Sequence, residues 1–333
     1  MASSRNNPCT DGSALAEPIV AAVAAILLRQ VGAGQAVVVG LSGGVDSVVL
    51  LHILKRLSAR HHLLLSACHV HHGLSPNADA WQQHCAALCA GLALPLSVHQ
   101  VVVSDSGGEG LEAAARRARY QAFSELNADW VALAHHRGDQ AETLLFNLLR
   151  GTGLRGAAAM QVARRGALNL LRPLLDLPRS ELVAYAEHHH LQWIEDESNT
   201  DTRFSRNHLR LETLPALQQR FPAGEANLAA AARRFGEALA LLDDLAGLDL
   251  GDCAPEFPLS VSLLMPLSEP RGRNLLRFLL AAHGVGIPSE ERLSEALRQL
   301  LGARVDRHPS IRFGHHTLYR ERGQIKLREV FDS

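Results

Sequence analysis

The chain has 333 residues, enough for about two domains, of which 47% are hydrophobic and 20% are charged. These proportions are typical of a folded globular protein and exclude a largely disordered chain. With a formal net charge of −1, no global positive field attracts nucleic acid, so RNA binding would depend on local basic patches.

The N-terminal region and the cysteines bear on the cellular compartment. Residues 1–17 are mostly polar, contain no signal-peptide pattern, and are expected to be frayed. The apolar run at residues 19–28 is too short to span a bilayer and predicts a buried helix. Five cysteines at irregular spacing, without a Cys-x2-Cys pair, fit reduced thiols. We therefore expect a cytoplasmic protein without membrane contact.

A glycine-rich loop follows the first predicted strand. Residues 35–41 (QAVVVGL) predict a buried parallel strand, and residues 48–57 continue with apolar residues at helical spacing. Between them, the loop Ser42-Gly43-Gly44-Val45-Asp46-Ser47 presents backbone amides at a helix N-terminus, where they can bind phosphate. The alternative is a turn whose glycines merely permit positive φ, with Asp46 or Ser47 capping the helix.

Strands and helices alternate along the next hundred residues. Strands are predicted at 61–70, 96–103 and 129–134, and helices at 79–90, 109–126 and 140–150. This alternation predicts a doubly wound α/β fold with a mostly parallel sheet and helices on both faces. Because ligands bind beyond the carboxyl ends of such strands, we expect polar clusters at 42–47, 69–73 and 135–142 to converge on one crevice.

The cluster after the fourth predicted strand contains two carboxylates. Asp139 and Glu142 lie three residues apart at a predicted helix start, and therefore on one face. This spacing is also a common capping signature. His135 and His136 precede the pair at a strand end opposite a phosphate loop, which favours a cation site.

The loop is of a particular type. Both lysines of the chain, Lys55 and Lys326, lie outside it, which excludes a Walker A loop. It resembles instead the PP-loop of ATP pyrophosphatases, which split ATP between the α and β phosphates. The resemblance implies that Asp46 helps to place Mg²⁺. It also implies that ATP is bound, with its departing pyrophosphate, by Ser42, Gly43, Gly44, Val45, Asp46 and Ser47.

Ordered motifs across residues 36–211 resemble those of the bacterial tRNA(Ile)-lysidine synthetase family. They lie at 42–47, 69–74, 112–120, 135–143, 150–156, 171–175 and 193–210. The last stretch, IEDESNTD followed by FSRNHLR, is characteristic of that family rather than of PP-loop proteins at large. Two positions depart from its pattern: Gly138 stands where the family usually has an Asp, and His71 where it more often has Asn.

This resemblance implies ATP-dependent ligation of free L-lysine to C2 of the wobble cytidine, position 34, of tRNA(Ile) with the anticodon CAU. AMP transfer to the C2 oxygen releases pyrophosphate, and the lysine ε-amine then displaces AMP. Asp139 and Glu142 would hold the lysine ammonium, while Arg116 or Arg119 and His135 contact the α-phosphate. The implied catalytic residues are Asp46, Arg119, His135, Asp139 and Glu142.

Further arginines predict contacts to tRNA. Arg203, Arg206 and Arg210, with Asn207, fall at roughly helical spacing near the end of the resemblance. With Arg116 they are expected to bind the tRNA substrate through its phosphates. A solvated basic face is the alternative.

Four segments are expected along the chain. A frayed N-terminus at 1–17 precedes a PP-loop catalytic domain at 18–211, a linker at 212–225 and an accessory tRNA-binding domain at 226–333. Predicted helices at 225–245, 271–283 and 289–301, with a hairpin at 310–330, predict a small α+β accessory domain. The oligomeric state stays open, a homodimer being one option.

Two other functions stay open at this point. A PP-loop tRNA thiolase would need a Cys-x2-Cys pair or a thiol beside the loop, and Cys68 is the cysteine at a predicted strand end. The other is a non-catalytic RNA-binding protein that uses ATP to set its shape. The carboxylate pair opposite the loop argues against it.

Overall fold

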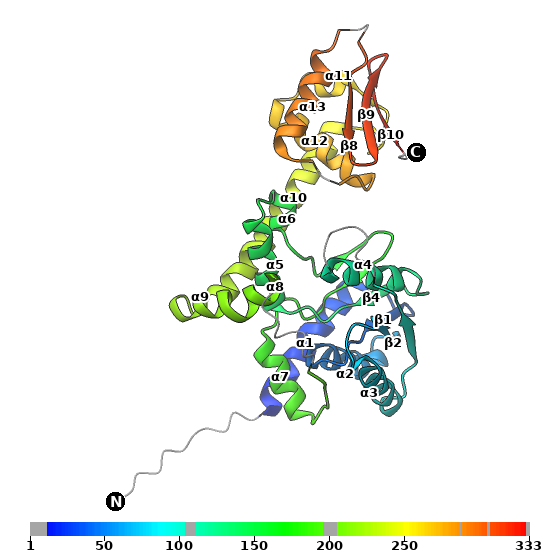
Figure 1. The fold of residues 1–333 in the computed structure, drawn as a ribbon, viewed down its shortest axis with the longest axis vertical. Helices are drawn as coiled ribbons and strands as arrows, with labels where there is room; N and C mark the ends of the chain where they lie inside the picture. Colours follow the sequence, from blue (N-terminus) through cyan, green and yellow to red (C-terminus); the bar gives the residue numbers. More distant parts are fainter. Residues whose placement is uncertain (1–11, 104–110, 196–204, 287, 305–306, 331–333) are drawn as a thin grey trace, which may run out of the picture. The chain divides into compact units, whose positions relative to one another are not determined.

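Two units make up the chain, Met1–Phe235 and Gly236–Ser333. The computed structural model describes residues 12–103, 111–195, 205–286, 288–304 and 307–330 (Figure 1). Helix α10 (Gly224–Leu250) contributes to both units. The expected linker at 212–225 contains helix α9 (Leu214–Arg220) and the start of α10. The two units meet between Phe235 and Gly236, inside this helix. The assignment of functions to the two parts stays a prediction.

The first unit is built on a six-stranded sheet in the order β3-β2-β1-β4-β6-β5. Its strands pair in parallel except for β5, which runs antiparallel to β6. The strands are β1 (Ala36–Gly40), β2 (Leu64–His71), β3 (Leu96–Gln100), β4 (Trp130–Ala132), β5 (Ala163–Arg164) and β6 (Leu170–Leu171). This mostly parallel sheet confirms the predicted α/β class.

Helices cover both faces of the sheet, because strand side chains alternate between the faces. In β1, Val37 and Val39 pack in the cluster of α1, α2, α3 and α7, whereas Val38 packs with Phe123 of α4. Figure 1 shows α2 and α3 on one side of these strands and α4 on the other. The helices are α1 (Gly12–Gln30), α2 (Val45–Ser58), α3 (Ala78–Gly91), α4 (Leu111–Ser124), α5 (Arg137–Leu149), α6 (Leu154–Ala157), α7 (Arg179–His188) and α8 (Ser205–His208). Within the described ranges, no helix has both the length and the apolar character needed to cross a membrane.

In the first unit, helix α5 also packs against α6 and α10. A small apolar cluster joins Leu144 of α5, Ala157 of α6 and Ala232 of α10. A π-helical segment, η2 (Leu209–Thr213), follows α8 and leads into α9. Arg210 of η2 contacts Glu142 of α5, so the chain after residue 204 returns to the helix that carries the predicted carboxylates.

The second unit contains a four-stranded antiparallel sheet in the order β7-β10-β9-β8. The predicted hairpin is confirmed by β9 and β10, whose turn residues Arg322 and Gly323 have φ of 48° and 74°. Positive φ at both central residues is typical of a two-residue hairpin loop. The other elements are β7 (Leu259–Ser260), α11 (Val261–Leu264), α12 (Glu269–Ala282), α13 (Glu290–Gly302), β8 (Ser310–Phe313), β9 (His316–Glu321) and β10 (Gln324–Glu329).

Candidate active site

Three helices begin at the carboxyl edge of the first sheet. Strands β1, β4 and β6 are neighbours in the sheet, and the chain leaves them towards α2, α5 and α7. The strand order reverses between β1 and β4, and at such a point diverging loops leave room for a ligand. The predicted clusters at 42–47 and 135–142 meet here, since His136 Nε2 lies 4.0 Å from Asp46 Oδ2.

The glycine loop is held by the hydroxyl of Ser47. Ser47 Oγ accepts from the backbone amides of Ser42 at 3.3 Å and Gly43 at 3.2 Å, and donates to the carbonyl of Gly44 at 2.9 Å. The N-cap of α2 is Gly44, and neither Asp46 nor Ser47 caps this helix. Val45 is buried in the core, so it can offer a ligand its backbone alone. Hydrogen bonds within the turn therefore hold the shape of the loop.

Gly43 is needed for two separate reasons. Its φ of +90° lies in the region that favours glycine, and a Cβ would stand 2.7 Å from Ile194 Cδ1. The backbone of Ile194 also donates to the Gly43 carbonyl at 3.0 Å. The segment just before residue 196 therefore closes against the loop from one side.

Cys85 of α3 is the cysteine beside the loop, rather than Cys68. Its Sγ lies 3.3 Å from the position of a Gly43 Cβ and 3.5 Å from His69 Nδ1. Burial raises the pKa of this thiol to about 12. A thiol that stays protonated is a poor nucleophile, so its surroundings do not fit a catalytic cysteine.

The predicted cluster at 69–73 begins inside strand β2. Strand β2 continues to His71, so His69 lies inside the strand, buried, with Nδ1 2.9 Å from the Leu41 carbonyl. His71 contacts Asp79 of α3, with Nε2 3.0 Å from Oδ1. His69 thus supports the residue before the glycine loop, and His71 binds to a neighbouring helix.

Helix α5 begins with a reciprocal capping box. The His136 ring accepts at Nδ1 from the amides of Gly138 and Asp139, and Asp139 Oδ2 accepts from the His136 amide at 2.9 Å. A Cβ at Gly138 would stand 2.9 Å from His136 Cε1. Glycine at this position therefore leaves room for the imidazole cap. Asp139 takes part in capping as the third residue of the box, whereas the box considered from the sequence, with Asp139 as cap and Glu142 three residues on, is not the one that forms.

Capping occupies one oxygen of Asp139 and leaves the other for a cation. Arg210 Nη2 lies 3.2 Å from Asp139 Oδ1, and Arg210 Nε donates to Glu142 Oε2 at 3.0 Å. Arg206 adds a longer ion pair, with Nη1 3.8 Å from Glu142 Oε1. The two carboxylates thus form a cation site, which Arg210 fills from another part of the chain. The predicted contact of Arg210 with tRNA phosphates stays a prediction.

Burial and charge act against each other at these carboxylates. The Glu142 side chain is 2% exposed, and this burial raises its pKa, against the opposing effect of Arg210. Burial also raises the pKa of Asp46, although His136 and Arg179 lower it. Asp46 Oδ1 is buried without a hydrogen-bond partner in the described part of the chain. Such an oxygen is available to a metal ion or another ligand.

His135 lies in a basic surrounding. Burial lowers its pKa to about 3, and the charges of Arg172, Arg116 and Arg119 act in the same direction. The imidazole is therefore neutral, and its Nδ1 has no hydrogen-bond partner among the described residues. Arg116, predicted as a substrate contact, lies with its guanidinium 5.1 Å from the centroid of the Tyr120 ring.

The remaining residues that are predicted to contact the tRNA lie on α8 or outside the residues that the structure describes. Arg206 lies in α8 with its guanidinium 5.5 Å from the centroid of the Phe146 ring of α5, and Asn207 follows it in the same helix. Arg203 lies outside the described residues. Residues 205–210 of the FSRNHLR stretch therefore lie against α5, the helix that carries Asp139 and Glu142.

Sequence reasoning missed two charged contacts at the site. Arg179, the first residue of α7, has Nε 3.8 Å from Asp46 Oδ1. Arg137 Nε donates to Glu225 Oε1 of α10 at 2.9 Å. The first could have been found by applying the strand-end rule to β6, since Arg179 begins the next helix. The second joins residues far apart in the sequence and had no local signal.

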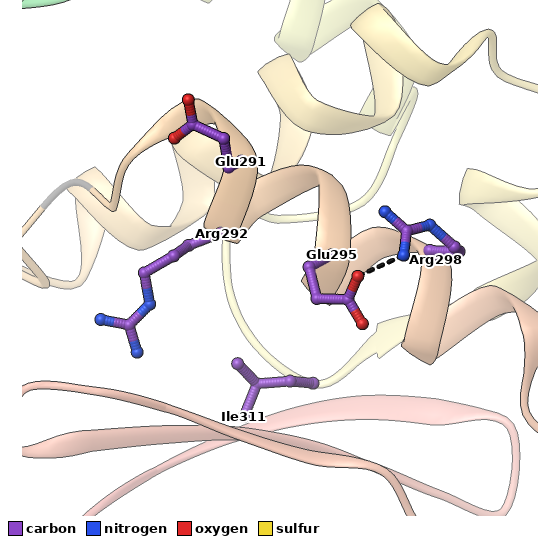
Figure 2. Close-up of a pocket in the computed structure, with 5 residues that line it drawn as sticks. All are labelled: Glu291, Arg292, Glu295, Arg298 and Ile311. Carbon is purple, nitrogen blue, oxygen red and sulfur yellow. Dashed lines mark hydrogen bonds and ion pairs between the residues drawn. The ribbon is translucent and has the colours of Figure 1, made fainter.

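Two surface hollows lie outside this site. One, of about 330 Å³, is lined by residues of α9, of the start of α10 and of the segment between them, among them Leu217 and Phe221. The other, of about 380 Å³, lies in the second unit between α13 and β8. Figure 2 shows its lining, with Arg298 paired to Glu295 and Ile311 on the strand below. Neither lining includes the glycine loop or the two carboxylates.

Two family models match the chain. Residues 17–217 match the PP-loop domain, and residues 259–325 match the TilS substrate binding domain. The fold is also similar to that of the U34-tRNA thiolase NcsA from Methanococcus maripaludis, with a TM-score of 0.59 and 18% identity over 70% of this chain and 82% of the thiolase. At this identity the likeness concerns the fold alone.

Curated relatives are much closer in sequence. The chain is 46% identical over 286 residues to a tRNA(Ile)-lysidine synthase of Nitrosomonas europaea, an alignment that covers 85% of this chain and 62% of the relative. It thus spans about three fifths of that relative's length. It is 44% identical over 316 residues to a tRNA(Ile)-lysidine synthase of Ralstonia nicotianae, covering 93% of this chain and 68% of the relative. By these matches, the chain belongs to the tRNA(Ile)-lysidine synthase family of PP-loop proteins.

Proposed function

We propose that this chain is a ligase that uses ATP to join L-lysine to C2 of cytidine 34 in tRNA(Ile) with the anticodon CAU. The names of its relatives support this activity. One structural observation carries the proposal. His136 Nε2 lies 4.0 Å from Asp46 in the glycine loop and 3.5 Å from Asp139 on α5. A phosphate site and an acidic site therefore share one crevice, as the transfer of an activated group to an amine requires.

In the first step, the C2 oxygen of the cytidine attacks the α-phosphorus of ATP and pyrophosphate leaves. The loop amides and the N-terminus of α2 hold the departing pyrophosphate. Mg²⁺, when bound, neutralises charge on the phosphates. Asp46 suits this ion because Oδ1 is buried and, in the described chain, unpaired. A group of three or more metal-binding side chains is not found among the described residues, and Mg²⁺ usually binds through one or two carboxylates, phosphates and water.

The groups around His135 can stabilise charge that develops on the α-phosphate. A neutral imidazole donates or accepts one hydrogen bond without a change of charge. Arg116 and Arg119 supply positive charge from α4. We propose that these three side chains hold the adenylyl group while the glycine loop holds pyrophosphate.

In the second step, the lysine ε-amine attacks C2, loses a proton, and AMP leaves with the former C2 oxygen. Asp139 and Glu142 position the ammonium of the incoming lysine. Arg210 occupies the same two carboxylates, so the lysine has to share them with Arg210 or displace it. The raised pKa of Glu142 also suits this group to accept the proton from the amine.

The second unit has a separate part in the proposal. Its match to the TilS substrate binding domain supports binding of the tRNA there. The tRNA and free lysine are thus the proposed substrates, and the cytoplasm is the proposed compartment.

The test measures pyrophosphate and AMP release by the purified chain. Reactions contain ATP, Mg²⁺ and tRNA(Ile), with or without lysine, and a matched tRNA in which cytidine 34 is replaced by uridine. We expect AMP release that requires lysine and cytidine 34, and a tRNA product heavier by one lysine residue. Lysine-independent turnover would favour thiolation of a base, and the absence of turnover would favour a binding protein. Either outcome contradicts the proposed ligation.

A further inference from the structure

Helices α2 and α7 run parallel and in one register. His52 Nδ1 lies 2.9 Å from Tyr185 Oη, and Arg56 Nη1 lies 3.5 Å from His189 Nε2, each pair separated by 133 residues in the sequence. Asp46 and Arg179, at the starts of the two helices, have the same separation and lie 3.8 Å apart. Because all three pairs have the same separation in the sequence, the two helices keep one register along their length. The N-terminus of α7 therefore lies level with the glycine loop.

The start of α7 is also held from the side of α5. The backbone amide of Arg137, the first residue of α5, donates to the carbonyl of Leu177 at 2.9 Å. Leu177 lies two residues before α7. Leu182 and Tyr185 are buried against the core that also contains α2. The position of Arg179 is thus set by packed helices, and groups on rigid elements are placed more closely than groups on loops.

The contact that the structure shows for the Arg179 side chain is a weak one. It is 59% exposed, and its Nε to Asp46 Oδ1 distance of 3.8 Å is too long for a hydrogen bond. An exposed ion pair of this kind contributes little to stability. A guanidinium presents several donors in a fork that matches phosphate oxygens. Helix N-termini, here those of α2 and α7, also favour an anion.

We propose that Arg179 is a phosphate-binding residue of the nucleotide site, contacting the polyphosphate chain of ATP held by residues 42–47. The inference rests on the proposed function, because it takes ATP as the ligand of that loop. Without nucleotide, Arg179 screens the charge of Asp46. With nucleotide, its guanidinium binds phosphate oxygens, and Asp46 is released for the cation that accompanies them.

The experiment measures ATP binding to the full chain by titration calorimetry, without tRNA or lysine. We expect Arg179→Gln to weaken ATP binding about tenfold, as for loss of a charge-assisted contact. Arg179→Lys keeps the charge without the fork and is expected to recover part of the loss. AMP, with one phosphate, should be affected less than ATP. The matched control is Arg60→Gln, an exposed arginine just beyond the other end of α2, which should bind ATP as the wild type does.

A second measurement excludes an effect that acts through Asp46 alone. Removing Arg179 exposes the carboxylate of Asp46, which repels phosphate. We therefore compare Asp46→Asn with the double variant Asp46→Asn/Arg179→Gln in EDTA, where no metal contributes. The proposal expects the tenfold loss to persist in this background. It is overturned if the loss vanishes there, or if Arg179→Gln alone binds ATP within about twofold of the wild type.

These outcomes separate the inference from the proposed function. If the wild type binds ATP and Arg179→Gln weakens it, the inference holds even where no lysine is transferred to tRNA. If lysine is transferred and ATP affinity is unchanged by the substitution, the inference fails alone. A wild-type chain that binds no ATP overturns both.

Discussion

The two sides of the candidate site are held by contacts of different range. On the loop side, the Ser47 hydroxyl joins backbone groups no more than five residues away. On the carboxylate side, Arg210 reaches Glu142 and Asp139 across 68 and 71 residues. The glycine loop is thus shaped mainly within its own turn, whereas the pair of carboxylates is completed by a distant segment.

This difference predicts how each side responds to damage. The hydrogen bonds of the Ser47 hydroxyl lie within the turn itself, and one further hydrogen bond, from the Ile194 amide to the Gly43 carbonyl, comes from a distant segment. The carboxylates of α5 keep their partner only while α8 and η2 lie against that helix. Substitutions on the loop side should therefore have confined effects, and those on the carboxylate side should change both the charge balance and the stability of the unit.

The largest expected effect is that of Asp139→Asn. The amide oxygen of asparagine can still accept from the His136 backbone, so the α5 cap remains, but the negative charge that positions an ammonium is lost. We expect lysine transfer to slow roughly 100-fold, in line with about 3 kcal/mol for a lost charge partner. Adenylated tRNA should still form and accumulate. Single-turnover reactions analysed by mass spectrometry of the tRNA would measure both steps.

The control for this substitution is Glu125→Gln, at an exposed carboxylate between the end of α4 and the start of β4, at the opposite edge of the sheet. It should transfer lysine at the wild-type rate. Loss of adenylation together with lysine transfer in Asp139→Asn would show that Asp139 is not specific to the lysine. The carboxylate side would then serve both steps, and the comparison between the two sides would fail.

Next in size is the effect of Arg210→Gln on stability. Glu142 would remain buried with its negative charge and without its main partner. We expect the free energy of unfolding at pH 8 to fall by about 2 kcal/mol, below the usual range for a buried pair because the Arg210 side chain is 42% exposed. Urea unfolding at pH 5, 6.5 and 8 would measure the change.

The pH dependence of that variant has a definite sign. Burial raises the pKa of Glu142 and Arg210 opposes the rise, so removing Arg210 raises this pKa further. A carboxyl whose pKa is higher in the folded state is favourable at low pH, and that contribution is lost as the pH rises through the folded pKa. The deficit should therefore be smallest at pH 5 and largest at pH 8. Arg210→Gln/Glu142→Gln should remove most of this pH dependence, and an equal deficit at every pH would contradict the assignment.

The difference between local and long-range contacts also explains what could be predicted from the sequence. The strand at 35–41 and the loop after it follow from local composition, and Arg322 with Gly323 marked the hairpin. The meeting of residues 42–47 and 135–142 followed from the rule for parallel sheets. Each of these inferences needs neighbouring residues or one rule of topology.

Contacts between distant segments were beyond that reasoning. Nothing around Arg210 distinguishes an arginine that pairs with carboxylates from one that contacts phosphate, since the guanidinium suits both. His71 was expected just beyond a strand end and is the last residue of β2, because strand ends are uncertain by a few residues. The division at Phe235 falls inside α10, where a continuous helical pattern conceals it.

Ser47→Ala tests the local side and should have a smaller effect on stability. The substitution removes a hydroxyl that joins Ser42, Gly43 and Gly44, and we expect about 1 kcal/mol lower free energy of unfolding. Urea unfolding should give the same deficit at pH 5, 6.5 and 8, because no charge is altered. Ser58→Ala, at the far end of α2, removes one hydroxyl contact to Lys55 and serves as the control. A deficit that varies with pH would mean that the loop and the carboxylates are coupled.

The smallest expected effect is that of Glu225→Gln, which removes the charge from the contact with Arg137 across 88 residues. Both side chains are partly exposed, and Gln can still accept a hydrogen bond, so we expect a loss of only about 0.5 kcal/mol. A double-mutant cycle with Arg137→Gln would measure the coupling in urea unfolding. A coupling near this value would mean that the apolar contacts of Leu144, Ala157 and Ala232 hold α5 against α10. A coupling above about 2 kcal/mol would instead make the ion pair the main link, and α5 would then depend on one distant charge more strongly than the loop depends on its own hydroxyl.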